Sequence, residues 1–274
     1  QYIIAAGGKR LRPAILLLMC GALGFRGPER FTLAAVVEFI HTATLLHDDI
    51  MDKAPLRRAK PTVHTQWNSD IAILSGDTMF VKSCELMMQV EDKFLRQVMN
   101  LFHKTAVEVC EGQQLDMNFE SRNDVSIPEY IHMISLKTAV LLACSMQLGA
   151  ILAGASKADA ELIYQFGKNL GIAFQLHDDI LDVYADSTKF GKQVGGDILS
   201  NKKTFLLLTA LATAHETQKA ELDNWLSDKK HKPSEKVKAV KGIYESLNIR
   251  ESAEEEMGKY FFAAMQSFEK IQAD

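Results

Sequence analysis

A seven-residue stretch occurs twice in this chain, as Leu46-His-Asp-Asp-Ile-Met-Asp52 and, with one change, as Leu176-His-Asp-Asp-Ile-Leu-Asp182. Each copy follows an apolar run with helical periodicity, and the i, i+4 spacing puts its outer aspartates on one helix face. Because the helix dipole disfavours negative charge near a C-terminus, these carboxylates cost stability unless something binds them. Two such groups facing each other would suit hard cations with oxygen ligands. We therefore predict a metal site formed by Asp48, Asp49, Asp52, Asp178, Asp179 and Asp182.

Basic side chains follow each acidic group directly. This order suits a polyanionic ligand that cations hold on one side and basic side chains hold on the other. Magnesium fits the cation role because it keeps several waters and bridges phosphates while using only one or two carboxylates. Diphosphate is the simplest ligand that fits. The basic residues are Lys53, Arg57, Arg58 and Lys60 after the first group, and Lys189, Lys192, Lys202 and Lys203 after the second.

The segment Gly7-Gly-Lys-Arg-Leu-Arg-Pro13 places three cations in four residues before an apolar helix. Cations are unfavourable at a helix start, so an anion is expected to bind there. Beside the acidic groups, this segment indicates a second phosphate site. His41 precedes Asp48 by two helical turns, and it can be either a phosphate ligand or a residue of the core.

Several other polar residues are candidates for the same site. Lys137 lies where a polar helix start becomes apolar, so its side chain can extend into a cavity. Gln113, Gln114 and Gln175 are neutral hydrogen-bonding groups, although Gln114 fits an ordinary helix surface equally well. The two histidines before the acidic groups lack further ligands at zinc spacing and are interpreted as orienting or packing groups.

Composition narrows the class of protein. The 274 residues are 47% hydrophobic and carry a net charge of −4, which argues against nucleic acid as a partner. Four separated cysteines without a C-x-x-C pair indicate a reducing compartment, here the cytoplasm. We identify no signal peptide and no transmembrane segment, because the longest apolar run is too short to span a bilayer. The chain starts in the middle of a pattern, so we expect an N-terminal helix to be missing.

Apolar periodicity predicts an all-α protein. Few prolines and glycines interrupt the periodic blocks, and no change in composition marks a linker, so we predict one domain over residues 1–274. The apolar second half of 128–154 predicts a helix central to the bundle. The predicted helices are 10–23, 30–52, 71–90, 92–119, 128–154, 157–186, 201–226, 234–247 and 250–271.

With these motifs the chain resembles the trans-isoprenyl diphosphate synthases, also called polyprenyl synthetases. The resemblance extends over nearly the whole chain. It is carried by G-G-K-R-L-R-P at 7–13, D-D-I-M-D at 48–52, L-R-R at 56–58, K-P-T-V-H at 60–64, G-D at 76–77, G-Q-Q-L-D at 112–116, K-T at 137–138, F-Q-L-H-D-D-I-L-D at 174–182, F-G-K-Q-V-G-G-D at 190–197 and N-K-K-T at 201–204. The chain departs from the family pattern at Ala59 and Asn201, where glycine is common.

The resemblance implies a large helical bundle of the isoprenoid synthase type with a central active-site cavity, and a homodimer. It implies Mg²⁺-dependent, head-to-tail condensation of isopentenyl diphosphate with an allylic diphosphate. Asp48, Asp49, Asp52, Asp178 and Asp179 would hold three Mg²⁺ ions with support from Asp182. Substrate-binding roles would fall to Arg57, Lys137, Lys192 and Lys202 for the allylic diphosphate, and to Lys9, Arg12, His41 and Arg58 for isopentenyl diphosphate. Gln175 would lie near the reacting carbons, and Thr138 would also bind substrate.

Product length is expected to depend on residues one turn before the first acidic group. Ala43 and Thr44 are small, whereas aromatics at this depth often accompany short products in the family. We therefore expect a product of C20 or longer, with farnesyl diphosphate as the alternative. Deeper candidates are Phe39, Ile40, Met79, Phe80, Ser83 and Met87.

Other classes remain as alternatives. A terpene cyclase shares the bundle and the first motif, but its second metal site usually carries Asn, Ser and Glu. A head-to-head synthase has a different acidic spacing, and a non-catalytic subunit of a heteromeric synthase is expected to have lost aspartates. A di-metal carboxylate bundle needs Glu-x-x-His pairs, which the sequence lacks.

Overall fold

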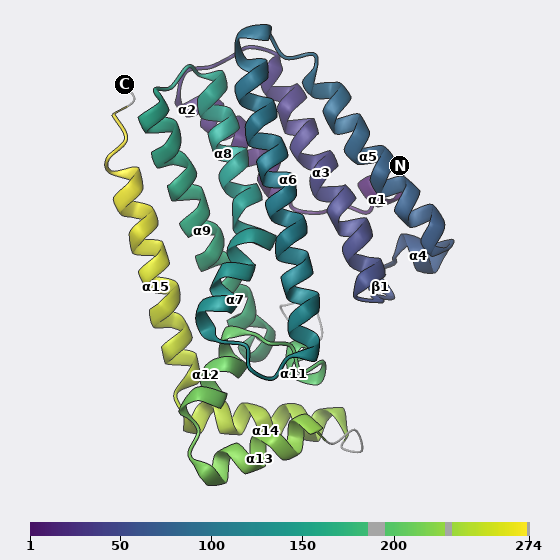
Figure 1. The fold of residues 1–274 in the computed structure, drawn as a ribbon, viewed down its shortest axis with the longest axis vertical. Helices are drawn as coiled ribbons and strands as arrows, with labels where there is room; N and C mark the ends of the chain where they lie inside the picture. The colour runs from purple at the N-terminus through teal and green to yellow at the C-terminus, as the bar shows by residue number, and fades with distance from the viewer. Residues whose placement is uncertain (186–194, 228–231, 273–274) are drawn as a thin grey trace. The chain divides into compact units, whose positions relative to one another are not determined.

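The structure, a computed structural model, describes residues 1–185, 195–227 and 232–272. These residues fold into helices and one short hairpin (Figure 1), which confirms the predicted all-α class. The elements are α1 (Tyr2–Ala5), α2 (Leu11–Ala22), α3 (Glu29–Met51), β1 (Leu56–Arg57), β2 (Lys60–Pro61), α4 (Val63–Gln66), α5 (Ser69–Met87), α6 (Asp92–Ser121), α7 (Ile127–Ile134), the π-helix η1 (Ser135–Ala139), α8 (Val140–Leu152), α9 (Lys157–Tyr184), α11 (Gly196–Leu199), α12 (Phe205–Thr213), α13 (Glu216–Ser227), α14 (Pro233–Ser246) and α15 (Ile249–Phe268).

The first of two compact units contains Gln1–Val109, Val140–Gly167 and Ser267–Asp274. Helix α3 packs along α5 and also contacts α2 and α8, which pack on each other (Figure 1). Apolar side chains of these helices are fully buried, among them Leu16, Leu33, Ile40, Leu46, Met87 and Leu148. Because α3 is anchored along its length, its C-terminal end holds the first acidic group on a rigid element.

A hairpin follows α3 and turns the chain back on itself. Strands β1 and β2 pair antiparallel, with Arg57 opposite Lys60. The turn residues Arg58 and Ala59 have φ values of 54° and 60°. Positive φ at both central residues is typical of a type I′ turn, which favours glycine. This explains why glycine is common at the position of Ala59. The hairpin and α4 together connect α3 to α5.

The second unit contains Cys110–Ala139 and Lys168–Gln266. Helix α12 packs against α7 and α14, while α11 and α13 also pack against α14 (Figure 1). Its core holds apolar side chains such as Phe119, Tyr130, Leu176, Leu206, Leu222 and Tyr244. The second acidic group therefore lies in α9 beside a core that several short helices complete.

Two predicted helices differ from the observed ones. The block 201–226 forms α12 and α13, because Ala214 has an extended backbone with ψ of 134°. No glycine or proline marks this break, so apolar periodicity passes over it. The block 128–154 begins at Ile127 after the capping box of Ser126 and Glu129, and it contains the π-helix η1.

The segment Ile127–Leu152 has 26 residues, and an 18-residue window within it has a mean hydropathy of 1.6, so its length and composition would allow a membrane span. Of that window, 78% is buried inside the protein. Helices in the core of a protein can have the same length and composition. The burial agrees with a helix of the protein core.

Candidate active site

The first acidic group occupies the end of α3, with Asp52 as the C-cap. Asp49 points inward and is 1% exposed, whereas Asp52 is exposed. Asp48 lies between these extremes, with 19% of its side chain exposed. The three carboxylates therefore sit at graded depth, from the core of the first unit to its surface.

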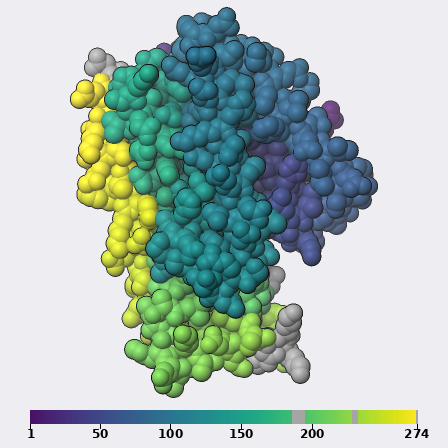
Figure 2. Space-filling model, in the orientation of Figure 1, coloured from purple at the N-terminus to yellow at the C-terminus, as the bar shows by residue number. Residues whose placement is uncertain are grey.

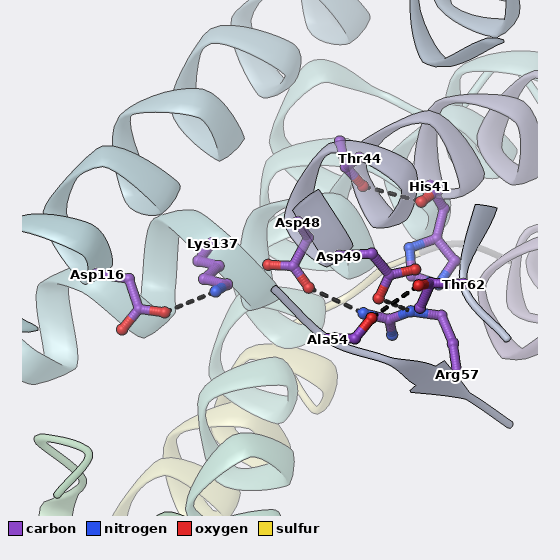
Figure 3. A network of polar contacts seen from close by, with 9 residues as sticks. All are labelled: His41, Thr44, Asp48, Asp49, Ala54, Arg57, Thr62, Asp116 and Lys137. Atoms are coloured by element: carbon purple, nitrogen blue, oxygen red, sulfur yellow. Dashed lines mark hydrogen bonds and ion pairs between the residues drawn. The ribbon is translucent and has the colours of Figure 1, made fainter. Parts of the chain in front are cut away.

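Arg57 of β1 reaches back to this group (Figure 3). Its Nε donates to Asp49 Oδ1 at 2.7 Å, and its Nη2 donates to Asp48 Oδ2 at 3.0 Å. A hydrogen bond of 2.7 Å from Thr62 Oγ1 to the carbonyl of Ala54 holds the connecting segment. One guanidinium thus positions two carboxylates, a geometry that a lysine could not provide.

The electrostatics of Asp49 favour a cation. Burial raises the pKa of Asp49, and the charge and hydrogen bond of Arg57 act in the opposite direction. Asp49 Oδ2 is buried and has no hydrogen-bond partner within residues 1–185, 195–227 and 232–272. Leaving a carboxylate oxygen buried without a partner costs free energy. A hard metal ion or its bound water would satisfy this oxygen.

Positive charge gathers around His41, beside the acidic group. Arg12 Nη1 lies 3.3 Å from His41 Nε2. Burial and then the charges of Arg12, Arg58, Arg57 and Arg10 lower the pKa of His41 to about 2. The imidazole is therefore neutral at physiological pH.

Arg12 is left with unused hydrogen-bonding capacity. Burial lowers its pKa to about 10, and its Nε is buried without a partner among the residues that the structure describes. Arg58 donates to the carbonyl of Gly7, while Lys9 is exposed. Arg10, by contrast, is occupied by an ion pair with Glu38. The predicted residues Arg12, His41 and Arg58 thus form a basic cluster that suits a phosphate group.

The second acidic group lies near the end of α9. Asp179 is 4% exposed and accepts hydrogen bonds from the hydroxyl of Tyr130, from Gln175 Nε2 at 3.1 Å and from the backbone N–H of Phe205 at 3.4 Å. Burial raises its pKa to about 7, although the hydrogen bond from Tyr130 opposes this shift. Asp178 is half-buried. Asp182 Oδ2 accepts the backbone N–H of Asp197 at 3.0 Å.

Lys137 and Thr138 lie in the π-helix η1, an element often found at functional sites. Lys137 Nζ pairs with Asp116 Oδ2 at 2.6 Å (Figure 3). Thr138 Oγ1 donates to Gln175 Oε1 at 3.2 Å. Gly112 of α6 permits this arrangement, because a Cβ there would lie 2.3 Å from the backbone nitrogen of Lys137. Thr138 and Gln175 are therefore connected to Asp179 of the second acidic group through hydrogen bonds, whereas Lys137 pairs with Asp116.

The remaining predicted residues are exposed, make a packing contact or lie outside the described residues. Gln114 is exposed and bonds to Asn118, as expected of an ordinary helix surface. Lys202 is exposed, and Lys192 lies outside the described residues. His47 Nε2 lies 3.2 Å from the carbonyl of Ile73, which fits a packing role.

The candidate chain-length residues lie in α3 and α5, which pack on each other. Ala43 is 3% exposed and Ser83 is fully buried. Thr44 donates to the carbonyl of His41 at 2.9 Å (Figure 3). Met79 packs against the cluster that contains Leu46. The ring of Phe80 stacks at 5.9 Å on the buried Phe102, a residue that the sequence analysis did not single out.

Magnesium is the implied cofactor, and the residues present fit it. The donor set is carboxylate, which suits a hard cation, and Asp49 offers a buried oxygen without a partner among the described residues. No cluster of three or more His, Cys, Asp or Glu side chains is gathered for a metal in the described part of the chain.

Sequence reasoning missed three residues of this region. Tyr130, Asp197 and Phe205 contact the second acidic group, yet each comes from another element. Asp116 appears in the G-Q-Q-L-D motif, but its pairing with Lys137 was not predicted. Two of these residues carried a signal: Asp197 ends the quoted motif at 190–197, and a buried tyrosine hydroxyl such as that of Tyr130 usually has a partner.

Comparison with known proteins agrees with these observations. The profile of the polyprenyl synthetase family matches residues 1–244. A geranylgeranyl diphosphate synthase of Methanosarcina mazei is 43% identical over 212 residues, covering 77% of this chain and 65% of that protein. A geranylfarnesyl diphosphate synthase of Natronomonas pharaonis is 42% identical over 228 residues, covering 77% of this chain and 67% of that protein. The chain thus spans just under two thirds of the length of the Methanosarcina relative.

A solved structure is similar over the whole chain. A crystal structure of a geranylgeranyl pyrophosphate synthase matches with a TM-score of 0.94 and 42% identity, covering 100% of this chain and 84% of that one. The predicted isoprenoid synthase fold is therefore confirmed. From the family profile, the relatives and the solved structure we conclude that this chain belongs to the polyprenyl synthetase family.

Proposed function

We propose that this protein is a Mg²⁺-dependent prenyltransferase that joins isopentenyl diphosphate head to tail to an allylic diphosphate. The observation that carries the proposal is the pairing of opposite charges through Arg57. This residue holds Asp48 and Asp49, and its charge also acts on His41 within the basic cluster. A carboxylate group for metal thus adjoins a site for phosphate, as two diphosphate substrates require. The names of the similar proteins support the same reaction.

Each part of the chain has a distinct role in this proposal. The six aspartates would hold magnesium, three ions when substrate is bound, with Asp49 and Asp179 fixed by neighbouring donors. When bound, magnesium supplies Lewis-acid stabilisation of the negative charge on the leaving diphosphate. Arg57, Lys137, Lys192 and Lys202 would bind the allylic diphosphate, and Lys9, Arg12, His41 and Arg58 would bind isopentenyl diphosphate.

The chain's own residues then act by binding, orientation and exclusion of water. The basic side chains stabilise diphosphate as the allylic C–O bond breaks and a carbocation forms. The double bond of isopentenyl diphosphate attacks this cation, and Gln175 orients the reacting groups with Thr138. A departing diphosphate oxygen then takes the proton that the new intermediate loses. His41 is assigned to phosphate binding and not to this step, because its neutral imidazole lies against Arg12 in the basic cluster. Apolar surroundings keep water from the cation.

We propose a product of C20 or longer. Ala43 and Thr44 leave no bulky side chain one turn before Asp48, and the similar proteins are named for geranylgeranyl and geranylfarnesyl products. Met79, Phe80 and Ser83 on α5 are the deeper candidates. Farnesyl diphosphate remains the alternative product.

We also propose that the protein acts as a homodimer through α5. Leu74 and Val81 of this helix and Met88 after it are exposed by 64%, 63% and 63%, and they recur every seventh residue as one apolar stripe. Figure 2 shows this helix at the surface of the first unit. Sedimentation at the concentration of the assay measures the oligomeric state.

The four cysteines, all in the described part of the chain, are unpaired, which supports a cytoplasmic location.

The function is tested by supplying labelled isopentenyl diphosphate with dimethylallyl, geranyl or farnesyl diphosphate, with and without Mg²⁺. The expected result is Mg²⁺-dependent formation of linear polyprenyl diphosphates of C20 or longer. Cyclic hydrocarbons from the allylic substrate alone would identify a terpene cyclase instead. Absence of any product from the folded protein would favour a non-catalytic subunit.

A further inference from the structure

A buried lysine outside every motif lies in the second unit. Lys236, in the first turn of α14, is 8% exposed. Its Nζ donates to Asn201 Oδ1 at 2.5 Å and to the carbonyl of Leu199 at 3.4 Å. An ammonium group is costly to bury unless nearby acceptors compensate for the lost water. The position of Lys236 therefore depends on these two acceptors, which belong to the segment before Lys202.

Asn201 connects this lysine to a third element. Its backbone has φ of 55°, in the left-handed region, and its Nδ2 donates to the carbonyl of Leu226 at 2.8 Å. Both polar atoms of its side chain are thus used, one toward α14 and one toward the end of α13. Glycine could adopt the same backbone conformation but could make neither of these hydrogen bonds.

The segment that these hydrogen bonds hold, residues 195–205, contacts the second acidic group at two places. The N–H of Asp197 donates to Asp182 Oδ2 at 3.0 Å, and the N–H of Phe205 donates to Asp179 Oδ2 at 3.4 Å. Between these attachments, the N–H of Lys202 donates to the carbonyl of Asp197 at 3.0 Å. The backbone of Lys202 therefore lies between two contacts with the aspartates and directly after Asn201.

Helix α14 holds the other end of the segment as well. Gly195 has φ of 84°, and a Cβ there would lie 2.7 Å from Cγ1 of Val237, the neighbour of Lys236. A small cavity beneath the segment is lined by Asp197, Asn201, Lys202 and Tyr244, among others. The hydrogen bonds of Lys236 and Asn201 therefore add to the close contact of Gly195 with α14 in holding the segment.

We propose that Lys236 and Asn201 are positioning residues that fix Lys202, and the segment attached to Asp179 and Asp182, for binding of the allylic diphosphate. The inference rests on the proposed function, which assigns Lys202 to that diphosphate. Neither residue needs to touch substrate, because the polar atoms of both side chains are used within the protein.

The test compares wild type with Asn201→Gly, Lys236→Met and the double variant. Asn201→Gly keeps the positive φ while it removes both hydrogen bonds. Lys238→Met is the matched control, since Lys238 is an exposed lysine of the same helix. The measurements are kcat, the KM for geranyl and farnesyl diphosphate, the KM for isopentenyl diphosphate, and hydrogen exchange at Asp197 and Lys202.

Each single variant is expected to raise the allylic KM about tenfold, the scale seen when groups that orient a ligand site are lost. The KM for isopentenyl diphosphate and all values for Lys238→Met should stay near wild type. The double variant should match the single ones, because the two residues act as a pair. A lower thermal stability with an unchanged allylic KM would overturn the proposal and leave a purely structural role.

Hydrogen exchange separates this inference from the proposed function. If wild type makes no prenyl product, the function fails, yet the positioning claim still predicts faster exchange at Asp197 and Lys202 in Asn201→Gly and Lys236→Met, by about tenfold. Unchanged exchange in both variants would overturn the positioning claim by itself.

Discussion

Tyr130 donates its phenol hydrogen to Asp179 from a helix 49 residues earlier in the chain, and both side chains are buried. The same carboxylate also accepts hydrogen bonds from Gln175 and from the N–H of Phe205. The middle aspartate of the second motif is therefore held by three donors within its own unit. Asp49, the middle aspartate of the first motif, is held by Arg57. In both motifs the outer aspartates are the more accessible ones.

Replacing Tyr130 by Phe should lower the free energy of unfolding by about 1.5–3 kcal/mol, because a buried charged group loses a donor. Tyr244→Phe is the control: Tyr244 is 2% exposed, close to the 1% of Tyr130, but no hydrogen bond joins its hydroxyl to the residues described by the structure. Urea unfolding at fixed protein concentration measures both variants. Equal effects of the two substitutions would contradict a specific role for the Tyr130 hydroxyl.

Replacing Asp48 or Asp178 by Ala should reduce turnover by about a hundredfold to a thousandfold, because stabilisation of the leaving diphosphate is lost. Both residues are only half-buried, so folding should survive. Asp223→Ala, at an exposed position of α13, is the control and should retain activity. Removal of Mg²⁺ by a chelator should abolish turnover in wild type. Condensation at near wild-type rates in either aspartate variant would disprove the metal-site assignment.

Replacing Gly112 by Ala should impair both stability and activity. The added Cβ would lie 2.3 Å from the backbone nitrogen of Lys137, so the π-helix must move. Overpacking of this kind typically costs about 1–3 kcal/mol. Gly258→Ala is the matched control in a helix, because nothing lies within 4 Å of its Cβ position. That control should be neutral or stabilising by up to about 1 kcal/mol. Urea unfolding measures the stability of both variants, and steady-state assays measure their activity. Wild-type stability and activity in Gly112→Ala would refute the packing argument.

His41 should make the protein less stable as the pH falls. Its pKa is lowered from 6.5 to about 2 in the folded state, so between these values the unfolded chain binds a proton that the folded chain does not. Stability contributed in this way is present above pH 6.5 and is lost below it. Between pH 8 and pH 5 the loss should be about 1–2 kcal/mol, reduced here for partial solvent exposure.

His41→Gln should therefore lose less stability than wild type over this pH range, while its amide can still accept from Arg12. The exposed His215→Gln variant is the control and should behave as wild type. Urea unfolding at pH 8 and pH 5 measures the difference. An identical loss in wild type and His41→Gln would contradict the neutral state of His41.

Replacing Ala43 by Phe should shorten the product, because an aromatic ring would then stand one turn before Asp48. The residue is 3% exposed, so the variant should also be less stable by about 1–3 kcal/mol. Thr44→Ser, which keeps the adjacent position small, should leave product length unchanged. Chromatography of the products gives the answer. A wild type that stops at farnesyl diphosphate would refute the role assigned to Ala43.

The sequence by itself determined the helical class, the family and the candidate metal residues. Helical periodicity is a local property, and the acidic groups are contiguous, so both can be read without knowledge of contacts. The basic cluster was also accessible to sequence reasoning, because Arg12, His41 and Arg58 belong to motifs that imply a shared ligand. Local patterns did not reveal the break at Ala214 or the type I′ turn at Ala59, since neither carries a glycine or a proline.

Only the tertiary structure decided how the aspartates are held. Tyr130 donates to Asp179, Gly112 leaves room for Lys137, and Lys236 donates to Asn201, and each pair is separated by 25 or more residues of sequence. These contacts depend on which side chains of distant elements share one small volume, and no periodicity or motif encodes that. The repeated acidic stretch therefore supplies the carboxylate ligands, while tertiary packing determines which of these carboxylates are buried and which are accessible.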